Sequence, residues 1–427
     1  MAEVCRPDRL HSVGPWRTIQ SSFPVTAAVC HDPRVRPVHL LLVTLLAASP
    51  AAVPAPAPAQ AGPEPGPRTW RVGPDRALAS PSAAAAVARD GDTVLIDAGS
   101  YPGDVATWTQ DDVTLRAVGG RVRLPADGNS AQGKAIWVVA GDRTRVEGIE
   151  FSGAAVPDRN GAGIRQEGAG LTVVGSVFHH NENGILAGAN AASDIRVERS
   201  RFQANGAGDG YSHNLYVGAV RSLTVTGSVL AGASVGHELK SRALRTVVTG
   251  NRIVDGAGTA SYSIDVPNGG ETFVAGNVVE QGAASQNPVL VAYGAEGLTH
   301  PRSRLWVVNN TFVNRRASGT FVALPDAGAE AHLWNNLLVG PGDLTDGAAE
   351  RRGNRRVGVR GFVDAAAQDF RLRARSPARD RGVRPPRRWR ARWVYVAPLR
   401  TAPRPRAGRL DVGAYEFVPR RRRPAAG

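Results

Sequence analysis

The stretch Val248-Thr249-Gly250-Asn251-Arg252-Ile253 recurs, with variations, along the middle of the chain. The copies begin at Val146, Val173, Val197, Val225, Val248, Val274, Val307 and Leu333. The steps between them are 27, 24, 28, 23, 26, 33 and 26 residues, and the sixth position is always apolar. A repeat of this length is typical of a solenoid, in which each coil contacts only its neighbours. The Ser or Asn that fills the fourth position in every copy but the first predicts a ladder of side chains bonded to buried backbone at a turn.

A second apolar phrase follows each of the first seven copies, roughly 15 residues after the copy begins. It is centred on Ile164, Ile185, Leu215, Leu239, Ile264, Leu290 and Val322. Two strands and a shorter third strand in each coil fit a three-sided solenoid. We therefore predict an all-β fold, a right-handed parallel β-helix (solenoid) of about nine to eleven coils, with residues 62–340 as its body.

Both ends of the repeat carry features of caps. Residues 77–89 are rich in alanine and predict an N-terminal capping helix over the open end of the first coil. The phrase Gly91-Asp92-Thr93-Val94-Leu95-Ile96 follows, and the chain closes with Asp369-Phe370-Arg371-Leu372 and Asp411-Val412-Gly413-Ala414-Tyr415-Glu416. This opening and closing resemble the bacterial secreted right-handed β-helix proteins of the pectate-lyase-like superfamily. The resemblance covers roughly residues 69–418 and implies the fold more strongly than an activity.

The net charge of +15 on the 427-residue chain is concentrated near its C-terminus. Residues 341–427 hold 23 Arg and 8 acidic residues, a balance of +15, whereas residues 62–340 hold 24 basic and 26 acidic residues, a balance of −2. We expect residues 341–418 to form the last coils and a C-terminal cap with an irregular, solvated Arg-rich tail, and residues 419–427 to be disordered. A nearly neutral body argues against nucleic-acid binding as the main function.

The N-terminal region indicates export. Residues 40–48 form an apolar run that follows two arginines and precedes the small-x-small sequence Ala59-Gln60-Ala61. The run is too short to span a membrane and is typical of a signal peptide. We expect residues 1–61 to comprise a gene-model extension and this signal, and the mature protein to be secreted or periplasmic, to lack cysteine and to be a monomer. The alternative is a cytosolic start with an apolar core segment.

Polar residues gather on the second strand of three successive coils. Side chains alternate in and out along a strand, and neighbouring coils stack roughly 4.8 Å apart. If Leu215, Leu239 and Ile264 point inward, the residues on either side of them point outward. The predicted patch contains Asn214, Tyr216, Glu238, Lys240, Ser263 and Asp265, with Arg165, His213, His237, Arg242 and Asn268 beside it.

Lys240 is the most informative residue of this patch. The chain contains 50 Arg but only two Lys, Lys134 and Lys240. Arginine cannot readily give up its proton, whereas a lysine in the right surroundings can act as a base. A lysine kept at this position therefore suggests proton transfer. The alternative is a surface ion pair between Lys240 and Glu238 or Asp265.

Other residues of the patch also admit structural roles. His213 and His237 occupy equivalent positions and would fit a hydrogen-bonded stacking pair at a turn. Asp265 precedes Val266-Pro267-Asn268-Gly269-Gly270 and would fit a turn. The His179-His180 pair lies in an Asn-rich turn one coil earlier, where a structural role is favoured.

Residues 236–253 resemble the lysine-bearing strand of polysaccharide lyase family six, the alginate and dermatan lyases. In that family a Lys-Ser pair precedes a Gly-Asn turn by a similar distance, and the match places Lys240 at the position of the family's base. The family also has an acidic pair that binds calcium upstream of its lysine, and an Arg-His strand on the next coil. Here only Glu238 precedes the lysine, and the next coil offers Ser263-Ile264-Asp265. A calcium cofactor and the identity of the acid are therefore left open.

The favoured function is a lyase (β-elimination) on a uronic-acid-containing polysaccharide. Lys240 would take the proton from carbon 5, and Tyr216 or His213 would protonate the leaving oxygen, with His237 as a further candidate base. Arg242 or Arg165, or a cation bound at Glu238 and Asp265, would neutralise the substrate carboxylate and stabilise the enolate-like state. The expected substrate-binding residues are Arg165, Asn214, Glu238, Asp265 and Asn268.

Other functions fit the same residues. A carbon-5 epimerase uses nearly the same parts. A glycoside hydrolase would use Glu238 and Asp265 as its carboxylate pair. A non-catalytic glycan-binding or surface solenoid needs no catalytic group.

Overall fold

The computed structural model describes residues 66–405 and 408–419. The predicted signal peptide, both cysteines and residues 420–427 of the predicted tail lie outside these residues. Within the described residues, no helix is long and apolar enough to cross a membrane.

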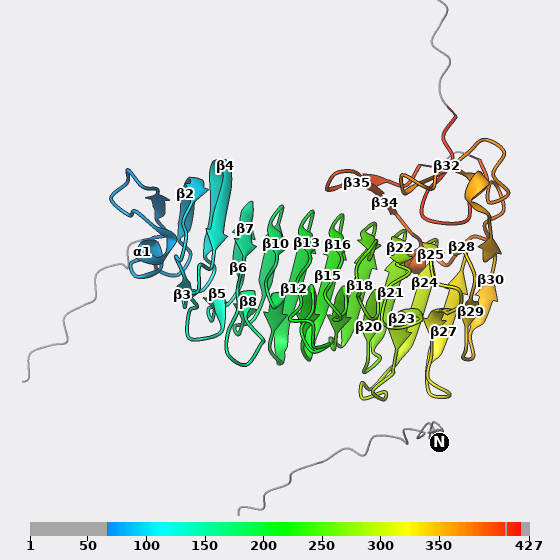
Figure 1. Cartoon of the computed structure of the whole chain (residues 1–427), viewed down its shortest axis with the longest axis horizontal. Coiled ribbons are helices and arrows are strands. Elements are labelled where there is room, and N and C mark those ends of the chain that lie inside the picture. The colour runs from blue at the N-terminus through cyan, green and yellow to red at the C-terminus, as the bar shows by residue number, and fades with distance from the viewer. Residues whose placement is uncertain (1–65, 406–407, 420–427) are drawn as a thin grey trace, which may run out of the picture. The chain divides into compact units, whose positions relative to one another are not determined.

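The chain winds into stacked coils with three faces, and each strand pairs in parallel with its counterparts on the neighbouring coils (Figure 1). Face 1 is a ten-stranded sheet, which agrees with the prediction of about nine to eleven coils. Its strands are β3 (Ala106–Trp108), β5 (Ala135–Val139), β8 (Ala162–Gln166), β11 (Asn183–Ala187), β14 (Leu215–Val217), β17 (Leu239–Ser241), β20 (Ile264–Val266), β23 (Val289–Tyr293), β26 (Thr320–Ala323) and β29 (Asp343–Thr345).

Faces 2 and 3 meet at the Gly-Asn corner of the repeat. Face 2 contains β1 (Thr69–Val72), β2 (Thr93–Ser100), β6 (Thr144–Glu147), β9 (Leu171–Val174), β12 (Asn190–Glu198), β15 (Val220–Thr226), β18 (Arg245–Thr249), β21 (Glu271–Ala275), β24 (Arg304–Val308), β27 (Glu330–Trp334) and β30 (Glu350–Arg352). Face 3 contains β7 (Ile149–Ser152), β10 (Val177–His179), β13 (Arg201–Gln203), β16 (Val229–Ala231), β19 (Arg252–Val254), β22 (Val278–Gln281), β25 (Thr311–Asn314), β28 (Leu337–Val339) and β31 (Arg355–Arg356). The long strand β4 (Thr114–Pro125) pairs with both faces.

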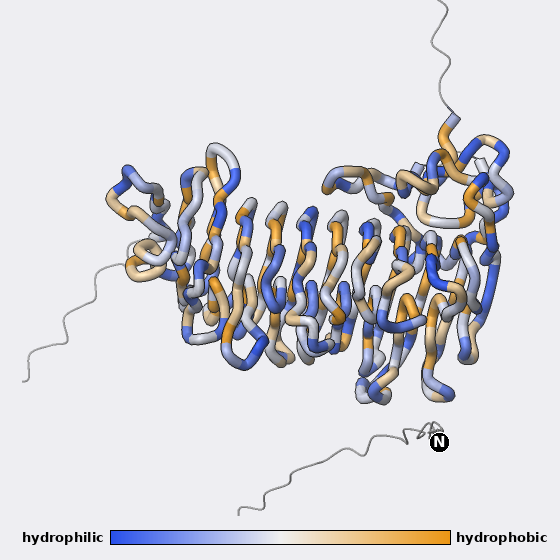
Figure 2. The backbone as a smooth tube through the Cα atoms, viewed as in Figure 1, coloured by the Kyte–Doolittle hydropathy of each residue, from blue (hydrophilic) through white to orange (hydrophobic). Residues whose placement is uncertain are grey.

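The predicted register of the first phrase is confirmed. Every copy pairs with the next at its first position, from Val146 with Val173 to Val307 with Leu333. The sixth position forms a fully apolar interior column, in which the rings of Phe151, Phe178 and Phe202 stack 5.0 and 4.7 Å apart. Figure 2 shows the resulting alternation of hydrophobic and hydrophilic segments within the coils. Stacking apolar columns therefore supplies the core that a single coil lacks.

The predicted Ser/Asn ladder is also confirmed. Each backbone N–H at this corner donates to the side chain on the next coil, as in Asn251 N–H to Asn277 Oδ1 at 2.9 Å. The Asn277 amide in turn donates to the Val248 carbonyl at 2.8 Å and to Asn310 Oδ1 at 3.0 Å. The ladder satisfies backbone groups that the corner would otherwise bury without partners.

The second phrase holds its predicted register except at one coil. Val291, and not Leu290, pairs with Ile264, so that Ala292 follows Asp265 on the outside. Residues from Leu290 to Tyr293 are all buried, and a continuous apolar run gives no alternation from which to assign a face.

Both ends differ from the predictions. The helix α1 spans only Pro81–Ala85, because Ser80 caps it and its C-terminal end lies at Ala86. Strands β29, β30 and β31 continue the coils beyond residue 340, as predicted for the last coil, but the Arg-rich segment after them is not an irregular, solvated tail over its described part. It contains η1 (Val359–Gly361), β32 (Phe362–Asp364), β33 (Asp369–Leu372), η2 (Arg387–Trp389), β34 (Trp393–Val396) and β35 (Arg400–Pro403).

The C-terminal segment folds back along the coils because apolar residues are spaced among its arginines. Trp389, Val394 and Tyr395 are buried, and the Trp389 ring stacks on Trp306 of face 2 at 5.2 Å. The antiparallel hairpin of β34 and β35 lies along the corner between faces 2 and 3 (Figure 1).

Candidate active site on face 1

The outward column predicted on face 1 is confirmed in its register. Arg165, Leu186, Tyr216, Lys240 and Asp265 pair in that order on five successive coils. Their strands are held by inward neighbours that are fully buried. The column therefore presents its side chains from a rigid part of the fold, which suits a site that needs defined geometry.

Lys240 lies at the centre of the polar part of this column. Its Nζ atom is 3.3 Å from Asp265 Oδ2 and 3.0 Å from Glu296 Oε1. The same atom lies 5.9 Å from the centre of the Tyr216 ring. Only 12% of the Lys240 side chain is exposed, compared with 45% of that of Glu296. The Lys240 side chain is thus almost completely buried, and Glu296 is its more exposed partner.

Arg242 stands beside the lysine and orders three neighbours. Its Nη2 atom is 2.6 Å from Glu296 Oε2, its Nη1 donates to Asn268 Oδ1 at 2.5 Å, and its Nε donates to the Tyr216 hydroxyl at 3.0 Å. The Tyr216 oxygen accepts in this last bond, so its own proton remains available for another acceptor.

Glu296 is the residue of the site that the sequence did not reveal. Its carboxylate bridges the two cations, with Oε1 on Lys240 and Oε2 on Arg242. Burial opposes its charge, but the hydrogen bonds from Lys240 and Arg242 outweigh burial and lower the pKa of Glu296. Glu296 lies in the loop after β23, within the 33-residue step from Val274 to Val307. That step is the longest between copies of the repeat and is the one signal that could have pointed to the loop.

Asp265 is a buried carboxylate with a raised pKa. Its side chain is 3% exposed, and burial raises its pKa to about 6 although Lys240 acts in the opposite direction. Its Oδ1 atom is buried and has no hydrogen-bond partner among the described residues. A buried carboxylate with one free oxygen beside an ammonium group is a suitable place to receive a proton.

His213 and His237 form a stacked pair, with ring centres 4.6 Å apart and planes 8° from parallel. The Nδ1 of His213 accepts the N–H of His237 at 2.9 Å, and the Nδ1 of His237 accepts the N–H of Tyr262 at 3.2 Å. Burial, followed by neighbouring positive charge, lowers the pKa of His213 well below its usual range and that of His237 to about 3. Each ring is therefore neutral with its proton on Nε2, and His237 directs that atom at Asp265 Oδ2, 3.5 Å away. This geometry argues against either histidine as a base or an acid and favours a positioning role.

The prediction that Asn214 and Glu238 point outward is wrong. Both side chains are fully buried, and the Asn214 amide donates to Glu238 within the corner before face 1. Burial raises the pKa of Glu238 to about 8. The reason for the error is local: β14 and β17 begin one residue later, so the alternation of an extended strand does not apply to these positions. Neither residue is accessible to a substrate, and the pair Glu238 and Asp265 required for a hydrolase does not face one cleft.

A cleft of about 600 Å³ continues from Arg242 toward the N-terminal coils. Arg165, Leu186 and Tyr216 line its floor, and Tyr211, which is 85% exposed, stands on its rim. The remaining lining comes from the loops around residues 158–160 and 209–211, from both ends of β11 with residues 188–189, and from residues 218–219 after β14. Among the residues that the structure describes, no three His, Cys, Asp or Glu side chains converge as metal ligands. Glu238 points into the corner, so Glu238 and Asp265 do not form the two-carboxylate cation site that was one of the alternatives.

No family model and no curated protein sequence matches this chain. Comparison with solved structures gives a clear answer for the fold. The chain resembles pectate lyase Pel9A. The TM-score is 0.59 at 16% sequence identity, and the match covers 82% of this chain and 96% of Pel9A. At this identity the likeness establishes the parallel β-helix fold.

Two weaker similarities extend the comparison. One is to a variant of the PL6 family alginate lyase AlyGC, with a TM-score of 0.36 and 14% identity over 68% of this chain and 40% of that one. The other is to the ORF18 protein of Geobacillus virus E2, with a TM-score of 0.35 and 14% identity over 62% of this chain and 53% of that one.

Proposed function

We propose that this protein is a polysaccharide lyase that cleaves a uronic-acid polymer by β-elimination, with Lys240 as the base. The observation that carries the proposal is the carboxylate of Glu296, which bridges Lys240 and Arg242 at 3.0 and 2.6 Å. Two cations on a rigid face, held by a half-exposed carboxylate from a loop, define a position that binds carboxylate groups. A uronate carboxylate is the substrate group that this position fits.

The chemistry follows from that position. A uronate carboxylate that displaces Glu296 would have its charge neutralised by Arg242, which makes the proton on the adjacent carbon 5 easier to remove. Lys240 would accept this proton, the carbon 4–oxygen bond would break, and a double bond would form between carbons 4 and 5. The Tyr216 hydroxyl would give its proton to the departing oxygen. Its hydrogen bond from Arg242 Nε stabilises the phenolate that remains.

Lys240 must be neutral before it can accept a proton, and Asp265 provides a route to that state. A bound sugar chain would exclude water from the pair, whose partners lie 3.3 Å apart. Transfer of a proton from the ammonium group to the Asp265 carboxylate then replaces two buried charges with two neutral groups, which burial favours. The pKa of about 6 for Asp265 is consistent with a carboxyl group that can hold this proton.

The position of the cleft beside the site suggests how a bound polymer would be oriented on the protein. Arg165 lies three coils from Lys240 along the column, or roughly 14 Å at the usual coil spacing. A chain that runs along the helix axis would reach Arg165 with a carboxylate of a neighbouring sugar. Asn268 takes part indirectly, because it accepts a hydrogen bond from Arg242 and so holds the guanidinium in place.

We also propose that the protein is a monomer that acts outside the cytoplasm. Export is supported by residues 40–61, which fit a signal peptide, and by the substrate, because a polysaccharide does not cross a membrane unaided. N-terminal sequencing of the exported protein should begin near Gly62. A mature protein that retains residues before Arg34 would contradict export by this signal.

The activity is tested by incubating the purified protein with polygalacturonate, alginate and other uronate polymers and recording ultraviolet absorbance, because β-elimination creates an unsaturated uronate. Absorbance together with new chain ends is the expected result. Deuterium uptake at carbon 5 without absorbance would indicate an epimerase instead. New reducing ends without absorbance would indicate a hydrolase, and binding without either change would indicate a glycan-binding protein.

A further inference from the structure

A second cavity, of about 1120 Å³, lies within the C-terminal segment and is bounded on the side of the coils by Asn309. Its charged lining consists of six arginines and one glutamate: Arg384, Arg387, Arg390, Arg392, Arg404, Arg409 and Glu416. The glutamate is already matched, since Arg404 Nε lies 2.7 Å from Glu416 Oε1 and both side chains are almost completely buried. Six arginines against one glutamate leave an excess of five positive charges around the cavity.

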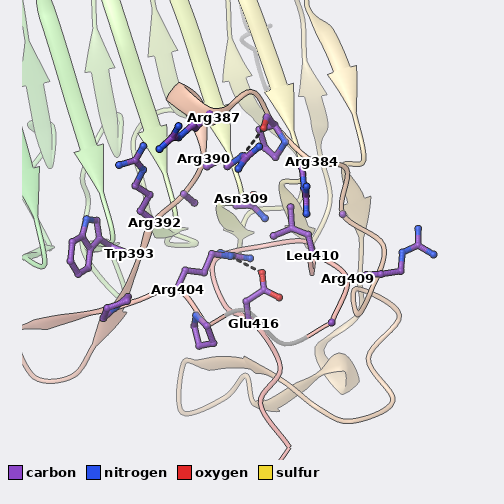
Figure 3. A pocket seen from close by; sticks show the side chains of 16 residues that line it. Asn309, Arg384, Arg387, Arg390, Arg392, Trp393, Arg404, Arg409, Leu410 and Glu416 are labelled. Carbon is purple, nitrogen blue, oxygen red and sulfur yellow. Dashed lines mark hydrogen bonds and ion pairs between the residues drawn. The ribbon is translucent and has the colours of Figure 1, made fainter.

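Among the described residues, three arginines of the wall make no polar side-chain contact that would hold the fold together. Arg384, Arg387 and Arg392 are exposed, and no side-chain hydrogen bond or ion pair involves them within the described part of the chain. Figure 3 shows these three side chains around one opening, with the Arg404–Glu416 pair facing them from the other side. Arg388 of the same segment, by contrast, pairs with Glu271. A group of uncompensated arginines around a hollow creates a positive potential that attracts anions.

An aromatic ring completes the cavity. Trp393 lines it and is 44% exposed, which is unusual for a tryptophan in this protein, since Trp108 and Trp137 are fully buried. It is fixed by β34, whose Trp393 Cβ packs directly against Gly250 at the corner of the coils. Flat aromatic faces bind the apolar faces of sugar rings, and guanidinium groups bind carboxylates in a two-pronged geometry. A tryptophan next to arginines therefore fits an acidic sugar.

We infer that this cavity is a second binding site for an acidic polysaccharide, which it grips through uronate carboxylates on Arg384, Arg387 and Arg392 and through a sugar ring on Trp393. The inference rests on the proposed function for the identity of the ligand. The site is separate from Lys240, because the hairpin of β34 and β35 lies at the corner between faces 2 and 3, whereas Lys240 is on face 1. Its role is to hold a long polymer on the protein while another part of the same polymer enters the cleft.

The test measures binding of polygalacturonate and of alginate to the mature protein in a Lys240→Arg background, which prevents cleavage. The triple variant Arg384→Ala/Arg387→Ala/Arg392→Ala should bind the preferred polymer roughly 10-fold to 100-fold more weakly, because three exposed ion pairs are lost. Trp393→Ala should weaken binding by roughly 3-fold to 10-fold. The matched control Arg360→Ala/Arg375→Ala/Arg381→Ala removes the same charge from exposed positions of the same segment outside the cavity, and it should bind as the parent does.

Cleavage of short oligouronates with an intact Lys240 is measured in parallel. The cavity triple variant should cleave them at the parent rate, since the cavity serves only long chains. If no cleavage occurs with any variant but the triple variant still loses polymer binding, the proposed lyase activity fails and the binding site stands. Equal polymer binding by the parent and the triple variant would overturn the inference. Tighter binding of oligothymidylate than of any uronate polymer, lost in the same triple variant, would reassign the cavity to nucleic acid.

Discussion

Replacing Glu296 by glutamine should tighten the binding of a uronate substrate. In the unliganded protein the Glu296 carboxylate occupies both cations of the site, at 3.0 Å from Lys240 and 2.6 Å from Arg242. A substrate carboxylate can reach these cations only when both contacts are broken. The glutamine variant removes the competing negative charge and keeps nearly the same side-chain shape.

The size of the expected change in KM follows from the solvent exposure of the ion pairs that Glu296 makes. Glu296 is 45% exposed and Arg242 is 25% exposed, so solvent screens both pairs. Ion pairs of this kind contribute about 0.5 kcal/mol each, and two of them give about 1 kcal/mol, or roughly a fivefold change in an equilibrium constant. We therefore expect KM for a short oligouronate to fall about fivefold in Glu296→Gln while kcat changes little.

The assay is steady-state kinetics on one oligouronate, recorded through the unsaturated product. Glu330→Gln is the matched control, because Glu330 is 51% exposed and pairs with Arg304 at 2.7 Å on face 2, away from the site. Its KM should equal that of the parent. An unchanged or higher KM in Glu296→Gln would refute the idea that Glu296 stands where the substrate carboxylate binds.

Three further predictions concern the stability of the fold. Burial raises the pKa of Glu238 to about 8, so the folded protein holds this proton more tightly than the unfolded chain does, and the free energy of unfolding should fall by about 2 kcal/mol from pH 6.5 to pH 8. Denaturant titrations at the two pH values measure this change, which Glu238→Gln should remove; a parent protein that gains stability over the interval would disprove the assignment. Asn277→Ala should cost about 2–6 kcal/mol, because it leaves the Asn251 N–H and the Val248 carbonyl buried without partners, and Asn277→Ser should cost less. Phe202→Asp should prevent folding, since it puts an unpaired charge into the stacked interior, and a variant that melts like the parent would show that the interior column is wrongly assigned.

Much of the fold could be predicted because each coil of a solenoid needs the same residue types at the same positions. The column that contains Phe151, Phe178 and Phe202 recurs at a fixed place in each copy, and any error in one coil would conflict with its neighbours. The outward order of Tyr216, Lys240 and Asp265 followed from the same register by strand alternation.

The errors occur where this periodicity stops. Asn214 and Glu238 precede their strands by one residue, and at a corner the side chain turns inward to satisfy the backbone. Glu296 lies in a loop that only one coil contains, so no column marks it. The C-terminal segment was expected to be solvated because of its arginines, yet sparse apolar residues such as Trp389 and Tyr395 are enough to fix it on the coils.

The central claim is that Lys240 removes the proton from carbon 5. The most direct test compares the rate of formation of unsaturated product by the parent protein and by Lys240→Arg on the best uronate polymer. Arginine keeps the positive charge and nearly the size but cannot act as a base, so the rate should fall about 100-fold or more while polymer binding and folding are retained. Tyr216→Phe should also slow the reaction, because its hydroxyl is the proposed acid. A Lys240→Arg protein that forms the unsaturated product at the parent rate would contradict the account.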